Sequence, residues 1–113
     1  MSGVNSNHSE NLAIVAGTVD GTPRTAASVT AGNGFYVDGT GTGVYSIVLD
    51  RAYQKIISCV ITTKTAGAVG SWITPGFTPG EVGGVITVST ANAAGALADA
   101  DFSIVVCLEV ADA

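Results

Sequence analysis

Short segments in which apolar and polar residues alternate recur along the chain from residue 12 onwards, separated by turn residues. The segment VYSIVLD at residues 44–50 is the clearest, because Tyr45, Ile47 and Leu49 occupy every second position. A period of two is typical of a strand with one buried face. Short strands about 8–12 residues apart, with Gly, Pro and Asn between them, indicate a β-sandwich or a barrel. No segment holds the period of an amphipathic helix over several turns.

This alternation predicts one all-β domain over residues 12–113, an antiparallel β-sandwich or jelly-roll-like domain with little helix. Asp50 is a candidate cap for a single helical turn in the linker after residue 49. The polar residues 1–11, MSGVNSNHSEN, fall outside the pattern, so we expect them to form an N-terminal arm. We expect strands at residues 12–19, 25–30, 35–37, 44–50, 56–63, 72–74, 85–90 and 102–110.

The composition is unusually poor in charge. Charged residues make up 12% of the chain, whereas about 25% is usual in soluble domains. Hydrophobic residues make up 47%, with Ala and Val prominent, since aromatic residues are only 6%. A monomer with so few charges has a poorly protected surface, so we infer that other chains cover part of it. The alternative is a compact Gly- and Ala-rich monomer that Thr, Ser and Asn keep soluble.

The net charge of −5 at pH 7 and the pI near 4.3 argue against nucleic acid as a partner. The four basic residues Arg24, Arg51, Lys55 and Lys64 are scattered, whereas a phosphate backbone or an anionic membrane needs a basic cluster. The N-terminus lacks the basic and apolar regions of a secretory signal, and no segment approaches the roughly 20 apolar residues of a membrane span. We therefore expect neither nucleic acid nor a membrane among the partners.

The two cysteines are expected to be unpaired. In the strand at 56–63, the alternation places Cys59 on one face with Ile57 and Ile61. In the strand at 102–110, the apolar set starts at Phe102 and places Cys107 on the opposite face. If both apolar sets face one core, the two sulfur atoms point in opposite directions. We therefore expect two free thiols, as in a protein made in a reducing cytosol.

Glycine is concentrated in residues 32–43, GNGFYVDGTGTG, directly before a predicted strand. A dinucleotide-binding loop needs G-x-G-x-x-G between a strand and a helix, but Gly39, Gly41 and Gly43 give G-x-G-x-G and a strand follows. A P-loop needs Gly-Lys-Ser/Thr, and this segment has no lysine. The glycines therefore indicate a hairpin turn and no nucleotide cofactor.

No arrangement of residues predicts a catalytic site or a metal site. His8, the single histidine, lies in the expected arm, and one histidine with two separated cysteines makes no zinc pattern. Asp99 and Asp101 could share one side of an Ala-rich loop and hold Ca²⁺, although solvated acids are the favoured interpretation. A carboxylate pair of the glycosidase type is not excluded, but so short a chain leaves little room for a cleft. We expect no enzyme activity, no cofactor and no metal.

Two patterns indicate candidate interface residues. The large aromatic residues in predicted loops are either lids on the protein's own core or anchors in a pocket of a partner. Three valines fall on the strand faces opposite to those assigned to the core, so they need covering. The candidate interface residues are Tyr36, Tyr53, Trp72, Phe77, Val48, Val60 and Val105.

A longer motif runs from Gly32 to Tyr53 and reads G-x-G-F-x-V-x-x-x-G-x-G-V-Y-x-I-x-L-D-x-A-Y. It resembles a segment of small virion proteins of tailed bacteriophages, in which a glycine turn and a G-x-G-x-Y strand lead into a D-x-A-Y corner. The following order of segments is also similar, and the resemblance extends over about residues 14–110. The chain is similar to head decoration proteins, also called cement proteins. The arm at residues 1–11 has no counterpart in this pattern.

The resemblance implies a small β-sandwich that forms a homotrimer on the symmetry axes of a capsid and has neither enzymatic activity nor a cofactor. The implied partners are further copies of the chain and the major capsid protein. The implied location is the virion, on the head surface, after synthesis in the host cytoplasm. A tail-fibre or head-fibre module that binds host glycans is the alternative, and Tyr36 and Trp72 exposed on one face would favour it. An enzyme of unknown type is a further alternative.

Overall fold

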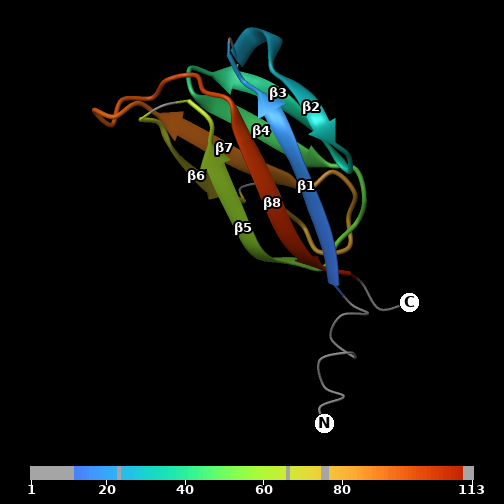
Figure 1. The fold of residues 1–113 in the computed structure, drawn as a ribbon. Coiled ribbons are helices and arrows are strands. Elements are labelled where there is room, and N and C mark those ends of the chain that lie inside the picture. Colours follow the sequence, from blue (N-terminus) through green and yellow to red (C-terminus); the bar gives the residue numbers. More distant parts are fainter. Residues whose placement is uncertain (1–11, 23, 66, 75–76, 111–113) are drawn as a thin grey trace.

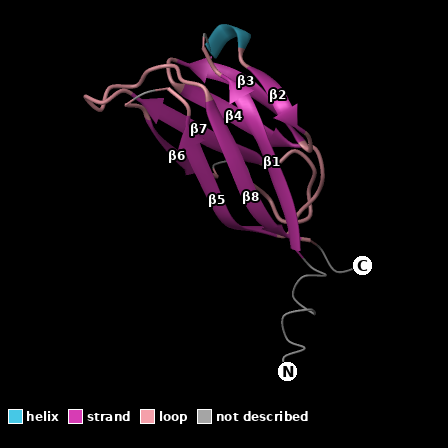
Figure 2. Ribbon diagram, viewed as in Figure 1, coloured by secondary structure: helices cyan, strands magenta, loops and turns pink. Residues whose placement is uncertain are grey.

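The computed structural model describes residues 12–22, 24–65, 67–74 and 77–110, and the expected arm at residues 1–11 lies outside them. One 3-10 helix, η1 at Arg24–Ala26, follows the first strand and is the only helix in the described part of the chain (Figure 2). The strands are β1 Leu12–Asp20, β2 Ser28–Gly32, β3 Phe35–Gly41, β4 Val44–Leu49, β5 Lys55–Thr63, β6 Val69–Ile73, β7 Val85–Ala91 and β8 Phe102–Glu109.

The strands form two four-stranded antiparallel sheets. The first sheet has the order β2-β1-β8-β5 and the second has the order β3-β4-β7-β6. In Figure 1 the first sheet lies in front of the second, and the described chain begins and ends at the same end of β1 and β8. The register pairs Leu12 with Glu109 at that end. The expected single antiparallel β-sandwich is therefore confirmed.

The expected strands are present with shifted ends. β2 begins at Ser28 rather than at residue 25, and β6 begins at Val69 rather than at residue 72. The helical turn expected after Asp50 does not form. The Asp50 amide donates instead to the carbonyl oxygen of Gly34 at 3.1 Å, and the Gln54 amide donates to that of Glu109 at 2.8 Å. These long-range bonds hold the linker against both sheets, so its backbone does not bond to itself.

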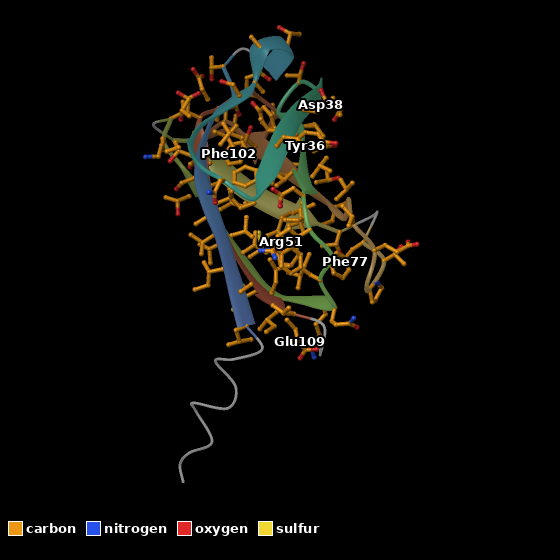
Figure 3. The ribbon with its side chains drawn as sticks, turned by 90° about the vertical axis from the view of Figure 1, so that its right-hand side faces the viewer. Tyr36, Asp38, Arg51, Phe77, Phe102 and Glu109 are labelled. Atoms are coloured by element: carbon orange, nitrogen blue, oxygen red, sulfur yellow. The ribbon has the colours of Figure 1, made fainter. Side chains whose placement is uncertain are left out.

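The core lies between the sheets and is made of every second residue of the central strands. In β4 the buried residues are Tyr45, Ile47 and Leu49, which confirms the alternation expected there. The ring centroids of Tyr45 and Phe102 are 5.2 Å apart at an interplanar angle of 55°, a favourable tilted arrangement. Phe102 lies inside the sandwich in Figure 3. Each such large side chain stabilises the fold by about 1.5–3 kcal/mol through burial.

One expected core residue is placed wrongly by simple alternation. Ile56 is opposite Leu108 and Ser58 is opposite Cys107, so Ile57 is an extra residue in a β-bulge of β5. The bulge shifts the alternation by one residue, and Ile57 is consequently exposed while Ile56 packs against the core. Beyond the bulge the expectation for Cys59 and Ile61 holds, because both pack against the core.

The glycine-rich segment forms the β3–β4 hairpin, as expected. Gly43 has a φ of +68° in its turn, and an added Cβ would lie 2.5 Å from the carbonyl oxygen of Thr90. The Gly43 amide donates to Oδ1 of Asp99 at 2.8 Å. Glycine is therefore needed here for both its left-handed backbone and its close approach to β7 and to Ala98 in the loop that follows.

Candidate interaction surface

The outer side of the first sheet carries an exposed apolar surface. The register places two rows side by side across β1, β8 and β5. The first row is Ala16, Val105 and Val60, and the second row begins with Ile14 and continues through Cys107 to Ser58. Directly opposite residues in adjacent strands have their side chains within contact distance. We define the outer apolar face by Leu12, Ile14, Ala16, Ile57, Val60 and Val105.

This face is open in the single chain. Ile14 is 70% exposed, Val60 is 56% exposed and Val105 is 45% exposed. The expectation that Val60 and Val105 lie on non-core faces is therefore confirmed. Single exposed apolar residues are ordinary, but contiguous apolar patches on a soluble chain mark interaction sites. Because these residues occupy neighbouring positions of one sheet, they form such a patch.

The β1 part of this face was missed in the sequence. Residues 12–16 read LAIVA, so both faces of the strand are apolar and alternation does not say which one is buried. The structure buries Val15 and Val19 and exposes Leu12 and Ile14. The signal was the lack of polar residues at either parity, which is typical of a strand covered on both sides.

Charged residues lie only at the ends of the outer apolar face. Lys55 and Glu109 are directly opposite each other at the end where the described chain starts and finishes. Asp20 is exposed at the other end of β1. The two central rows hold no charged side chain. A partner can therefore cover the centre of the face without burying a charge, which would cost several kcal/mol.

The outer side of the second sheet has a different character. The register places hydroxyl residues in its middle, with Ser46 opposite Thr87 and Ser89 opposite Ser71. Val48 is half-buried there, opposite Tyr36 on β3. Val48 is thus on a non-core face, as expected, but it lies apart from Val60 and Val105. The candidate valines therefore divide between the two outer sides of the sandwich.

The aromatic candidates also divide. Tyr53 is 5% exposed and belongs to the core cluster, so in this chain it is a lid on the core and presents no ring to a partner. Its carbonyl oxygen accepts a bond from the Gly80 amide at 2.9 Å, which anchors the middle loop. Trp72 and Phe77 are half-buried and pack against the core. Only Tyr36, which is 59% exposed, projects from the surface.

Tyr36 and Trp72 do not share a face. Tyr36 is opposite Val48 on the outer side of β3, which forms one edge of the second sheet. Trp72 lies on β6, the other edge strand, opposite the buried Val88 of β7. The side chain of Trp72 packs inward against the core. Figure 3 shows Tyr36 and Asp38 together beside β3. The pair of stacked aromatics that a glycan-binding surface would use is therefore not assembled from these two residues.

The cysteines follow the expected parity. Both are free. Cys59 is opposite Val106 and points to the core side, whereas Cys107 is opposite Ile14 on the outer side. Burial raises the pKa of the Cys59 thiol from 9.0 to about 11. Cys59 is consequently a poor thiolate at neutral pH, and Cys107 lies in the middle of the outer apolar face.

The two loop carboxylates have structural partners. Asp101 accepts a hydrogen bond from the Gly21 amide at 3.0 Å, and Asp99 accepts the bond from Gly43. The two carboxylates are therefore more than solvated acids, because each accepts a hydrogen bond from a glycine amide in a turn. Among the described residues, no group of three or more His, Cys, Asp or Glu residues is placed to hold a metal ion.

No helix in the described ranges is long and apolar enough to cross a membrane. No protein-family model matches the chain, and neither a curated protein nor a solved structure matches it.

Proposed function

We propose that this chain is a non-enzymatic virion structural protein of a tailed bacteriophage, which decorates the capsid and stabilises the shell by bridging capsomers. The observation that carries the proposal is the outer apolar face, a contiguous set of exposed Ile, Val and Leu side chains on a chain with few charges. Such a face favours a protein that acts by burying surface. The Gly32–Tyr53 motif resembles a segment of decoration proteins, and this resemblance is the reason for proposing a phage capsid as the binding partner.

The proposed mechanism needs binding alone. A subunit that contacts two capsomers binds the assembled shell and cannot make both contacts with separated capsomers. Its binding free energy therefore stabilises the shell alone, and the shell becomes harder to open. Several contacts per bound assembly raise the effective affinity without any new chemistry. The proposed partners are the major capsid protein and further copies of this chain, with a trimer as the assembly that the resemblance implies.

The rigidity of the sandwich suits this role. Asp99 joins the loop after β7 to the β3–β4 turn, and Asp101 joins the same loop to the turn after β1. The hydroxyl group of Tyr45 joins the turn after β1 to β4. A pre-organised surface loses little conformational entropy on binding. A decoration protein with this architecture therefore places its apolar side chains at fixed positions before it meets the shell.

The test compares virions with and without the protein. Particles assembled without it should release DNA at a lower temperature and after milder osmotic shock than complete particles. Adding the purified chain back should restore resistance, and electron microscopy should place the added density on the head. Equal survival of the two kinds of particle would contradict the proposal. Density at the tail, together with binding on a glycan array, would favour the fibre alternative instead.

A further inference from the structure

We infer that the outer apolar face is the contact between two copies of this chain, packed face to face about a two-fold axis. The inference deepens the proposed function and rests on it in one respect, namely that the same face is covered in the assembled state. It names the partner of that face as a second copy, so a two-fold pair takes the place of the trimer that the resemblance implies, and the contact with the capsid falls to other surfaces of the chain.

The first argument is area. The three strands β1, β8 and β5 carry the outer apolar face, and at the usual spacing of about 4.8 Å they make it about 14 Å wide. The eight residues of β8 make it about 27 Å long at about 3.4 Å per residue. The face therefore presents about 400 Å² per copy, and two faces in contact bury about 800 Å², which is the size of a weak and transient interface. The predicted association is consequently weak and depends on concentration.

The second argument is charge. The chain has a net charge of −5, so two copies repel each other through most of their surfaces. The central rows of the outer apolar face carry no charge, and Lys55 and Glu109 at one end carry opposite charges. This face is therefore a place where two acidic copies can meet without burying or opposing charges. A basic partner, in contrast, would find nothing to pair with in the central rows.

The third argument concerns symmetry. A two-fold contact uses the same patch on both subunits, whereas a closed ring needs two different patches that fit each other. The other exposed apolar strand residues include Val69 and Ile73, at the edge of the second sheet on the opposite side of the sandwich. Patches on opposite sides would stack copies into an open chain and would not close a trimer. A single flat apolar face can pack against the same face of one other copy, as the two sheets of a sandwich pack against each other. One such face therefore favours an assembly of two copies.

Two measurements on the full chain test the inference. Sedimentation of the unmodified protein over a wide concentration range should show a reversible change from the 11.2 kDa of one chain to twice that mass. Alkylation of Cys107, followed by peptide mapping, should become slower as the concentration rises, because the second copy covers this thiol. The Cys59 thiol, on the core side of the sheet, should show no such dependence.

A matched pair of variants locates the contact. Val60→Asp and Val69→Asp each place a charge at an exposed valine on an edge strand, but on opposite sides of the sandwich. Val60→Asp should raise the dissociation constant about tenfold or more, since it buries a charge in the contact. Val69→Asp should leave it unchanged. Circular dichroism and melting curves of both variants show whether each is folded.

Three results would overturn the inference. The first is a mass of one chain at every concentration, with Cys107 alkylated at a constant rate. The second is a mass of three chains, and the third is equal loss of association in both variants. If Val60→Asp does not fold, the Cys107 measurement on the unmodified protein still decides. A monomer or a trimer whose removal weakens virions would refute the two-fold contact alone, whereas a dimer whose removal leaves virions unchanged would refute the proposed function alone.

Discussion

The hydroxyl group of Tyr45 donates a hydrogen bond to the carbonyl oxygen of Gly21 at 2.8 Å. The same hydroxyl accepts a bond from the Ala100 amide at 3.0 Å. A side chain near the start of β4, a central strand of the second sheet, thus joins the turn after β1 to the loop before β8. This single group holds together segments that lie far apart in the sequence, and it closes the end of the sandwich opposite to the described termini.

Tyr45→Phe should destabilise the protein by about 1–3 kcal/mol, because it removes only the oxygen and leaves two buried backbone groups without a partner. Urea denaturation followed by circular dichroism measures the change in the free energy of unfolding. Tyr36→Phe is the matched control, since Tyr36 is exposed, and its effect should lie within about 0.5 kcal/mol. Equal effects of the two changes would show that the Tyr45 bonds contribute nothing.

Gly43→Ala should cost more than Gly95→Ala. Both glycines have positive φ, +68° and +87°, so both changes carry about 1–2 kcal/mol of backbone strain. At Gly43 the new Cβ would also meet backbone atoms of Thr90 and Ala98, whereas nothing lies within 4 Å at Gly95. We expect an extra cost of about 1–3 kcal/mol at Gly43 from this overpacking. Thermal unfolding compares the two variants, and equal melting temperatures would contradict the close approach.

Asp101→Ala should destabilise the protein by about 1–2 kcal/mol, because the Gly21 amide loses a charged acceptor. Asp101→Asn should recover part of this loss, since an amide oxygen also accepts a bond. Asp38→Ala, at an exposed position of β3, is the control and should have little effect. Chemical denaturation of the three variants gives the order of their free energies of unfolding. A neutral Asp101→Ala would mean that the turn after β1 does not depend on this carboxylate.

The free energy of unfolding should decrease as the pH rises, because Cys59 titrates. The folded thiol has a pKa of about 11, raised by burial from 9.0, so the folded state holds its proton more tightly than the unfolded state. This contribution is complete below pH 9 and is lost as the pH rises towards 11. Denaturation of the unmodified protein and of Cys59→Ala at several pH values isolates the effect, since other titrating groups are common to both. Parallel curves across this window would refute it.

Several features of this protein follow from the sequence alone, because they depend on local rules. The two-residue period at Tyr45, Ile47 and Leu49 predicts a strand with a buried face, and the structure buries all three. The opposite parity of Cys59 and Cys107 likewise predicts separated thiols, and both are free. Strand alternation and glycine turns need only neighbouring residues, so one sequence is enough to predict them.

Other features are decided only by tertiary structure. Ile57 is exposed because a bulge in β5 forms against β8, and no residue in ISCVI marks that bulge. Tyr53 belongs to the core cluster and its carbonyl oxygen accepts a bond from the Gly80 amide, although its position between strands resembles that of a surface anchor. The outer apolar face exists because β1, β8 and β5 lie side by side, and their order depends on contacts between residues distant in sequence. Long-range pairing is set by the packing of the whole chain, which local periodicity does not record.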